Sequence, residues 1–219
     1  ANVINFSWIT VTDAADLRDV IHYAINNGVI CVASAGNHQQ EHGYPVPKKF
    51  EPAAYSFSNS QVIAVTGTEL ISGIEMFRDG WNYSPGTDPI NDPQNSFVDF
   101  SAPGGGYSIL YQNTSPYIVD GYLHENNFGS SLAAPFVSGT IGLILSVNYN
   151  LDQQQVYNIL KQSTDKVGAH QYYQQSDGHT WNQYMGYGRI NAYKALKYTL
   201  ENYGGTLSQT LTIPSGETW

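Results

Sequence analysis

The sequence predicts an α/β fold with a doubly wound, mostly parallel sheet. The first observation is the order strand, helix, strand at the start of the chain. Residues 3–8 have the pattern of a short strand, residues 14–25 repeat apolar side chains at helical spacing, and residues 29–33 are continuously apolar. This order and length are typical of a βαβ unit. The second observation is that residues 61–66 resemble another buried strand and residues 97–101 resemble a further short strand.

The other segments alternate between loops and helices. Thr12 is the expected N-cap of the first helix, because acidic residues follow it, and Gly28 is expected just past the end of that helix. Residues 69–94 contain Gly, Pro, Asn and Asp throughout and are expected to be irregular. The remaining elements are expected as a hairpin-like stretch that ends at residue 120 and as helices at 131–147, 152–162 and 191–200.

The composition narrows the classes of function. The 219 residues are 41% hydrophobic, which is enough for one domain with a core. A formal net charge of −9 argues against nucleic-acid binding, which depends on clustered Lys and Arg. The one cysteine, Cys31, lies in an apolar run and is expected to be a buried small residue rather than a nucleophile. The longest apolar stretch, 132–147, is short for a membrane span and contains Pro135 and Gly139, so we expect a core helix and no membrane association.

A Gly-Ser-Ser turn that runs directly into an apolar helix is the strongest chemical signal. Ser131 stands at the expected N-terminus of that helix, where free N–H groups and the helix dipole favour developing negative charge. The neighbours of Ser131 are small, so a substrate backbone can come close. The alternative interpretation is an ordinary N-cap followed by a core helix.

A second signal is an asparagine at the end of a buried strand. Asn37 follows small residues at the carboxyl end of the run that begins at residue 29. Ligands of open α/β sheets bind outside the carboxyl ends of the strands, and an asparagine placed there can donate a hydrogen bond to an oxyanion. The alternative is an ordinary asparagine in a turn.

Several segments together, in this order, resemble the signature motifs of the subtilisin-like serine proteases. Gly-Ser-Ser-Leu-Ala-Ala-Pro at 129–135 is similar to the family's Gly-Thr-Ser-Met-Ala-x-Pro, and Ala-Gly-Asn at 35–37 is similar to its Ala-Ala-Gly-Asn. The further matches are Val-Ile-Asn-Phe-Ser at 3–7, Pro-Ala-Ala-Tyr at 52–55 with Val-Ile-Ala-Val at 62–65, Val-Asp-Phe-Ser-Ala-Pro-Gly at 98–104, and Tyr-Gly-Arg-Ile-Asn-Ala at 187–192. The resemblance spans residues 2–200 in the family's order.

This resemblance implies a role for individual residues. Ser131 resembles the nucleophile, and Asn37 resembles the side-chain half of the oxyanion hole, whose other half is the backbone N–H of Ser131. A second group matches the substrate-binding residues: a strand that pairs with the substrate backbone and one wall of the pocket for the residue before the cut. The members of this group are Ser7, Trp8, Ile9, Ala35, Gly36 and Ser130, and the segment near Phe50 and Glu51 aligns with the floor of the pocket. Trp8 and Ile9 replace smaller residues of the family, which narrows the expected cleft.

The catalytic Asp and His that precede the serine in the family are not in this chain. Both are expected upstream of the strand at 3–7, because the family order is Asp, His, Ser. The chain is therefore expected to begin inside the domain, with the missing N-terminal segment as its partner. We call this chain together with that segment the whole domain. The family's His-Gly-Thr context surrounds none of the six histidines, which are His22, His38, His42, His124, His170 and His179.

The family resemblance implies no cofactor for the chemistry and a structural role for Ca²⁺. Calcium in these proteases is held by loop carboxylates and carbonyls. The candidate calcium ligands are the acidic loop residues Asp79, Asp88, Asp92 and Asp120. The alternative interpretation is that these are solvated loop charges. No metal ligands are assigned.

Together these observations predict the C-terminal portion of a subtilisin-like catalytic domain at 1–203 and, at 204–219, a linker or the start of a further β-rich domain. The implied protein is a secreted or extracellular serine endopeptidase that hydrolyses polypeptide substrates through an acyl-enzyme on Ser131. The alternatives are a peptide-binding pseudoprotease and a structural or adhesive module. An esterase is disfavoured because the Gly-x-Ser-x-Gly elbow is absent. By itself the chain is expected to be inactive and to aggregate, because an unpaired sheet edge and apolar surface would be exposed.

Overall fold

A parallel sheet forms the centre of the computed structural model, which describes residues 1–12, 14–37, 47–57, 60–78, 80–93, 95–111, 118–119 and 122–205. Its strands run in the order β1 (Val3–Phe6), β2 (Ile30–Ser34), β5 (Ile63–Ile71) and β7 (Val98–Pro103), and all are parallel. Val3 lies opposite Ile30, and Val32 lies opposite Ile63. These four strands are those expected from the sequence, and the predicted α/β fold is confirmed.

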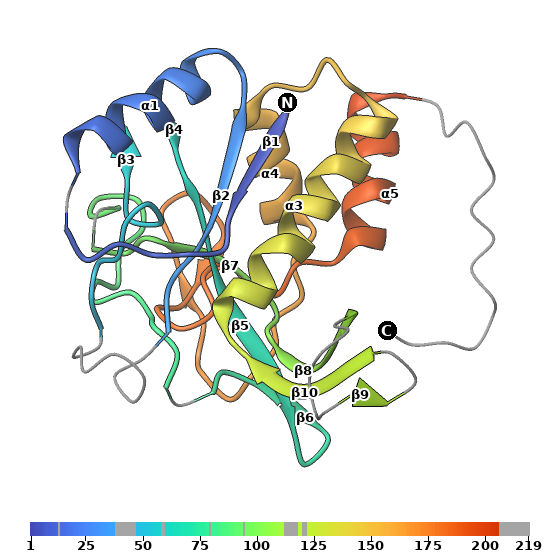
Figure 1. The fold of residues 1–219 in the computed structure, drawn as a ribbon. Coiled ribbons are helices and arrows are strands. Elements are labelled where there is room, and N and C mark those ends of the chain that lie inside the picture. The colour runs from blue at the N-terminus through green and yellow to red at the C-terminus, as the bar shows by residue number, and fades with distance from the viewer. Residues whose placement is uncertain are drawn as a thin grey trace.

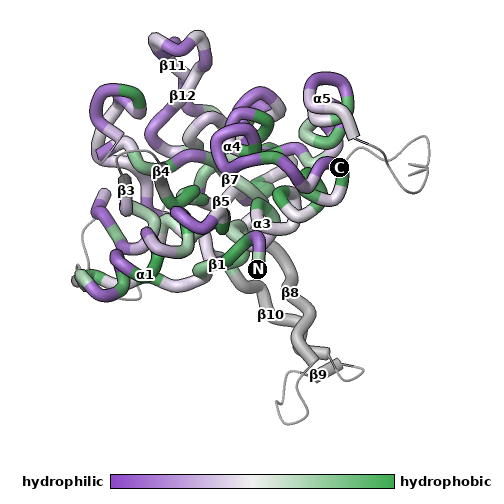
Figure 2. Tube along the Cα trace, turned by 90° about the horizontal axis from the view of Figure 1, so that it is seen from above, coloured by the Kyte–Doolittle hydropathy of each residue, from purple (hydrophilic) through white to green (hydrophobic). Residues whose placement is uncertain are grey.

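Both faces of the sheet are covered by helices, because successive side chains of each strand point to opposite faces. Ile30 and Val32 of β2 enter one core, whereas Cys31 and Ala33 enter the other. Helix α1 (Ala15–Asn26) covers the second core; α3 (Ser130–Val147) lies on the first, with α4 (Gln153–Gln162) and α5 (Ala192–Tyr203) beside it. Figures 1 and 2 show α1 and the group of α3, α4 and α5 on opposite sides of the strands.

The helix ends follow from their capping residues. Asp152 forms a capping box with Gln155 at the start of α4, and Asn191 accepts a hydrogen bond from the backbone of Lys194 at the start of α5. The prediction of Thr12 as the N-cap of α1 was wrong. That helix begins after Ala14, which provides no side-chain cap. Gly28, with φ of 80°, lies just past its end as predicted.

Short antiparallel hairpins complete the described fold. The expectation that residues 69–94 are irregular was wrong at its start, because β5 continues and pairs with β6 (Ile74–Met76). The two loop residues, Ser72 and Gly73, both have positive φ, which suits a two-residue hairpin turn. The other short strands are β3 (Ser56–Phe57) with β4 (Ser60–Gln61), β8 (Gly105–Tyr111) with β10 (Tyr122–Phe128) and β9 (Ile118–Val119), and β11 (Tyr173–Gln174) with β12 (Thr180–Trp181).

Cys31 is the second residue of the buried strand β2 and behaves as the sequence predicted. Its side chain is fully buried, and burial raises the pKa of the thiol to about 11. A thiol with that pKa stays protonated near neutral pH, and the thiolate is the nucleophilic form. Cys31 therefore packs as a small apolar residue.

Helix α3 has one face on the sheet and one face in solvent. Its length and apolar composition alone would also allow a membrane span, the one such helix among the residues described, but Val137, Ile141 and Ile144 are buried in the core. On the other face Phe136 and Leu143 are 55% and 45% exposed. Nearby, β1 pairs only with β2 among the described strands, so it forms an edge of the sheet.

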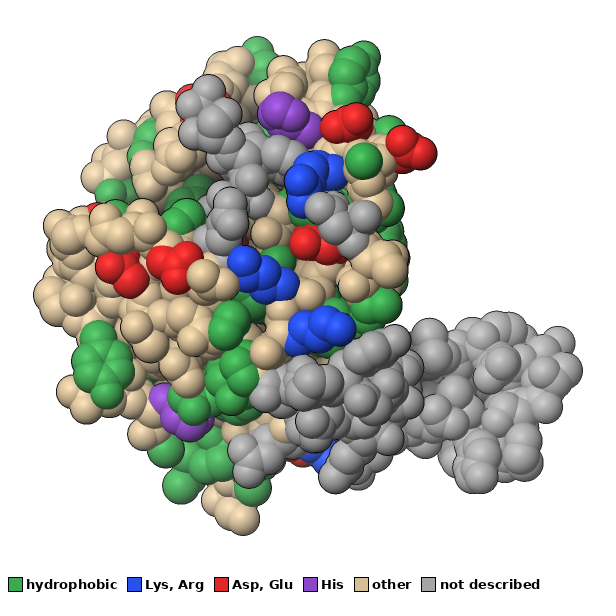
Figure 3. Space-filling view, turned by 90° about the vertical axis from the view of Figure 1, so that its left-hand side faces the viewer, with side chains coloured by type: hydrophobic (Ala, Val, Ile, Leu, Met, Phe, Trp, Pro, Cys, Tyr) green, Lys and Arg blue, Asp and Glu red, His purple; other side chains and the backbone are tan. Residues whose placement is uncertain are grey.

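The charged surface is mixed where it can be seen. On the face drawn in Figure 3, acidic and basic side chains of the described residues are interspersed, and apolar side chains lie between them. That face has no continuous basic stripe of the kind that contacts phosphates.

The exposed apolar face of α3 and the free edge of β1 predict that the chain alone aggregates, whereas the whole domain stays monomeric. Light scattering during size-exclusion chromatography would measure both. Phe136→Ser should reduce aggregation of the chain alone. Tyr149→Ser should not, although Tyr149 is 79% exposed, because it lies beyond the end of α3. A monomeric chain with a cooperative melt would contradict the prediction.

Candidate active site

The candidate site lies where the end of β2 meets the start of α3. Residues 35–37 continue from β2, and Ala35 still donates a backbone hydrogen bond to Val65 of β5 at 2.8 Å. Ser130 and Ser131 begin α3, which starts beside the carboxyl ends of β1 and β2 (Figure 1). The two sequence signals, 94 residues apart at Asn37 and Ser131, therefore meet at the edge of the sheet where ligands of open α/β folds bind.

The orientation of the Asn37 amide is fixed by Ser130. Oδ1 of Asn37 lies 2.9 Å from the backbone nitrogen of Ser130 and 3.0 Å from its hydroxyl oxygen. A backbone N–H can only donate, so the atom that faces it must be the amide oxygen. The Ser130 hydroxyl also accepts a hydrogen bond from the backbone of Gly36 at 3.1 Å. Since the oxygen of Asn37 is engaged, its NH₂ group is presented on the other side.

The Asn37 NH₂ group and the Ser131 hydroxyl border the same small space. A Cβ atom built on Gly129 would lie 2.8 Å from Nδ2 of Asn37 and 3.1 Å from Oγ of Ser131. Only glycine leaves that space open. Two further glycines are closely packed next to Gly129: a Cβ on Gly104 would lie 2.9 Å from the Gly129 oxygen, and one on Gly67 would lie 2.5 Å from the ring of Trp81. A reacting carbonyl group placed there would meet a hydroxyl and an amide donor together.

The end of β1 supports the start of α3 from the side. The Ser7 hydroxyl donates to the backbone oxygen of Ser131 at 2.7 Å, and the Asn5 amide donates to Ser7 at 2.8 Å. Ser138, two turns into α3, donates to the oxygen of the same Asn5 amide at 3.0 Å. These bonds join the end of β1 to the start of α3 and place the Ser7 side chain at the turn that carries Ser131.

The other residues expected at the substrate cleft are placed in different ways. Trp8 is 44% exposed and packs edge-on against Phe6. Ser130 is buried, and its hydroxyl is engaged with Asn37 and Gly36. It therefore positions the amide from below. Ile9 lies against Gly36, close to the position that a Cβ on Gly36 would take.

One residue that organises the cleft gave no signal in the sequence. The Asn82 amide donates to the backbone oxygens of Ala35 and Lys48 at 2.7 and 2.6 Å, and its oxygen accepts from the Lys48 nitrogen at 3.0 Å. Asn82 also donates from its backbone to the oxygen of Gly36. It clamps the segment at Lys48 to the strand end that precedes Asn37, yet it stands in a stretch of Asn, Gly and Pro that resembles an ordinary loop.

Comparisons with known proteins agree with this geometry. The model of the subtilase family matches residues 1–188. This chain belongs to the subtilase family. Over 199 residues it is 28% identical to the thermophilic serine proteinase of Bacillus sp. (strain AK1), a match that covers 90% of this chain and 38% of that protein.

Two crystal structures of proteases share the subtilase fold of this chain. Fervidolysin from Fervidobacterium pennivorans aligns with a TM-score of 0.67 and 22% identity, over 90% of this chain and 26% of fervidolysin. A lanthipeptide protease aligns with a TM-score of 0.61 and 24% identity, over 90% of this chain and 61% of its own. The subtilase fold predicted from the motifs is confirmed, and the chain spans only part of the relatives it matches.

The described histidines of this subtilase lie on other elements or contact residues other than Ser131. His22 lies on α1, which covers the face of the sheet opposite α3. His170 stacks on Tyr184 with ring centres 3.9 Å apart, and His179 lies 3.4 Å from Asp177. His38 and His42 lie outside the described residues, and of His124 only the backbone in β10 is described.

The acidic loop residues that the structure describes accept hydrogen bonds from their neighbours. Asp88 accepts hydrogen bonds from the backbones of Ile90 and Asn91 at 3.0 and 2.9 Å, and Asp92 accepts two from Asn95. Across the described part of the chain, no three His, Cys, Asp or Glu side chains are grouped to hold a metal. Asp79 and Asp120 lie outside it.

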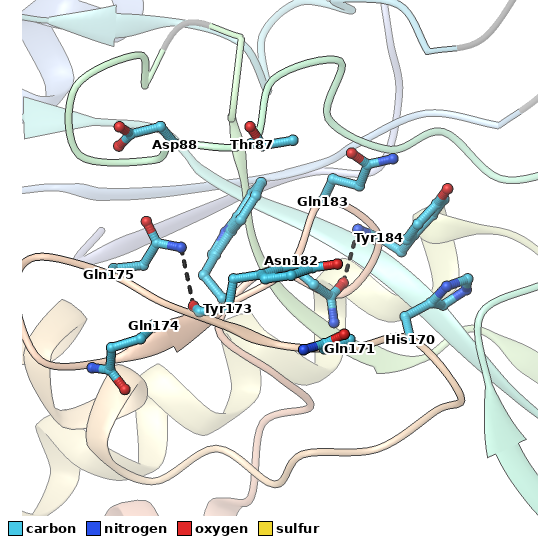
Figure 4. Close-up of a pocket in the computed structure, with 11 residues that line it drawn as sticks. Thr87, Asp88, His170, Gln171, Tyr173, Gln174, Gln175, Asn182, Gln183 and Tyr184 are labelled. Atoms are coloured by element: carbon cyan, nitrogen blue, oxygen red, sulfur yellow. Dashed lines mark hydrogen bonds between the residues drawn. The ribbon is translucent and has the colours of Figure 1, made fainter.

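A separate hollow of about 670 Å³ lies beside the β11–β12 hairpin. Figure 4 shows its lining of amide and aromatic side chains, with Tyr184 and His170 on one side and Gln174 and Gln175 on the other. None of the described residues around Ser131 lines it. This hollow is therefore distinct from the space between Ser131 and Asn37.

Gly36→Ala in the whole domain is expected to lower the free energy of unfolding by about 2–5 kcal/mol. About 1–2 of this comes from the positive φ of 99° and the rest from overpacking, because the new Cβ would lie 2.5 Å from the Phe50 ring. Gly28→Ala is the matched control: φ is 80°, no atom lies within 4 Å, and only the smaller cost applies. Urea unfolding measures both, and equal losses would show that the ring does not press on Gly36.

Proposed function

We propose that this chain carries the nucleophile and the oxyanion hole of a subtilisin-like serine endopeptidase. The observation that carries the proposal is the pair of hydrogen bonds from Ser130 to Oδ1 of Asn37. They aim the Asn37 NH₂ group at the space beside the Ser131 hydroxyl, where the oxygen of an attacked carbonyl would develop negative charge. Preorganised donors of this kind are the largest electrostatic contribution to many acyl transfers.

The proposed reaction is acyl transfer in two steps. Oγ of Ser131 attacks the carbonyl carbon of the scissile peptide bond, and its proton passes to a general base. Asn37 Nδ2 and the Ser131 backbone N–H hold the oxyanion of the tetrahedral intermediate. The C–N bond then breaks, the base gives its proton to the leaving amine, and water releases the acyl group by the same route in reverse. The chemistry needs no metal or organic cofactor.

The general base in this proposal is a histidine of the missing N-terminal segment, oriented by an aspartate of the same segment. Support comes from two open surfaces: β1 pairs only with β2 among the described strands, and Phe136 and Leu143 of α3 are exposed on the side of that helix near Ala192 of α5. Another part of a domain would cover such surfaces. The 38% coverage of the Bacillus proteinase leaves room for such a segment.

The setting of the proposed enzyme follows its family. The substrates are polypeptides, and the protein acts outside the cell, with no part for nucleic acid or membrane. Residues 1–203 form the later portion of the catalytic domain. Residues 206–219 lie outside the described residues, and we propose the segment 204–219 as a linker or the start of a further β-rich domain.

A fluorophosphonate probe should label the whole domain once, and Ser131→Ala should abolish the labelling. The probe reports an activated serine, because its phosphorus is attacked only by a nucleophile that a base has made reactive. Ser146→Ala, an exposed serine of the same helix, is the control and should label fully. A folded whole domain that takes no label would instead support a peptide-binding pseudoprotease.

Asn37→Ala in the whole domain is expected to lower kcat by about 10²–10³-fold with little change in KM, which is the effect measured for the loss of one oxyanion-hole donor in a subtilisin. Asn202→Ala, an exposed asparagine on α5, should leave both constants unchanged. Steady-state cleavage of a peptide anilide gives both. A rise in KM with kcat unchanged would instead mean that Asn37 contacts the substrate in the ground state and does not stabilise the oxyanion.

A further inference from the structure

The side chain of Phe50 occupies the slot beside the oxyanion donor. Its ring is fully buried and lies directly on Gly36, where a Cβ atom would be 2.5 Å from Cδ2 and 3.1 Å from Cε2. Cγ2 of Ile9 is 3.3 Å from the same point. Phe50 and Ile9 thus converge on the residue that directly precedes Asn37, and together they fill the space between the ends of β1 and β2.

The side chain of the substrate residue whose carbonyl is attacked would point into this slot. In the proposed reaction the carbonyl carbon contacts Ser131, and its oxygen contacts Asn37. This carbonyl belongs to the substrate residue P1, whose α-carbon is one bond away from the carbonyl carbon. On the side of Asn37 the neighbouring groups are Gly36 and the end of β1, which Ser7 ties to Ser131. A P1 side chain therefore extends toward the wall formed by Gly36 and Ile9, where it meets the Phe50 ring.

The ring is held in place from both sides. Thr10 and Glu51 exchange backbone hydrogen bonds of 2.7 and 3.1 Å, which pin the residue after Phe50 to the segment after Ile9. On the other side Asn82 clamps Lys48 to Ala35, and the Lys48 ammonium lies 5.7 Å from the centre of the Phe50 ring. A large P1 side chain would have to break this packing to enter.

We infer that Phe50, with Ile9, closes the P1 pocket and makes the enzyme selective for glycine or alanine before the scissile bond. This inference rests on the proposed function and names its substrate class. One methylene group in a closely fitted apolar pocket changes kcat/KM by about 10–200-fold. A P1 leucine or phenylalanine, which is several carbons larger than alanine, is therefore rejected by at least about 10-fold.

The test uses the whole domain and four peptide anilides that differ only at P1, with Gly, Ala, Leu or Phe. The wild type should cleave the Ala or Gly substrate at least about 10-fold better, by kcat/KM, than the Leu and Phe substrates. Phe50→Gly should raise the ratio of Phe to Ala cleavage at least about 10-fold, because the volume of the ring becomes free. Ile9→Gly should raise the same ratio to a smaller extent.

Two controls separate specificity from stability. Phe77→Ala removes a buried ring from a different cluster and should leave the ratio unchanged. Phe50→Leu disturbs packing less than Phe50→Gly and should shift the preference toward Leu if the more severe variant fails to fold. A ratio is insensitive to the fraction of folded enzyme, so a purely structural role for Phe50 would not move it.

Active-site titration with the fluorophosphonate distinguishes the two ways to fail. A wild type that is labelled yet prefers Leu or Phe at P1 would overturn the closed pocket and leave the protease intact. The same holds if Phe50→Gly and Phe50→Leu both fold, are labelled and keep the wild-type ratio. A whole domain that is not labelled would overturn the proposed function itself, and the inference would fall with it.

Discussion

The hydrogen bonds between Asn37 and Ser130 join the two halves of the site, and the rest of the arrangement depends on them. They connect the end of a strand to the start of a helix 93 residues later in the chain. The backbone N–H of Ser130 donates to the amide oxygen of Asn37, and an N–H can only donate. This hydrogen bond therefore fixes which side of the amide carries the NH₂ group. The sheet brings the two segments together, and Ser130 sets the angle at which they face a substrate.

Much of this architecture could be predicted because its signals are local. The strand β2 and the start of β5 are apolar runs, as strands buried on both faces must be, and α3 carries apolar residues on the face that packs on the sheet. The positions of Ser131 and Asn37 followed from short motifs whose residue types fit one kind of chemistry. The family resemblance then made their meeting in space an expectation, which the geometry meets.

The parts that escaped prediction depend on contacts between distant residues. Asn82 is one of many polar residues in its stretch, and only the fold shows that it joins Lys48 to Ala35. The N-cap of α1 moved from Thr12 to Ala14 because the chain that enters the helix is held elsewhere, by the pairing of Thr10 with Glu51. The alignment with the family placed Phe50 near a pocket floor, but the contact of its ring with Gly36 is a property of packing.

The closely packed glycines described above have a consequence for how such an enzyme can diversify. A side chain at Gly67, Gly104 or Gly129 would collide with neighbouring atoms, so the close packing of the main chain beside the Asn37 and Ser131 side chains depends on these glycines. Ordinary point mutations there can only damage it. Evolution of the substrate specificity is therefore expected at the walls of the pocket, at positions such as Ile9 and Phe50. There a single substitution can enlarge or close the cavity, while the reacting atoms keep their positions.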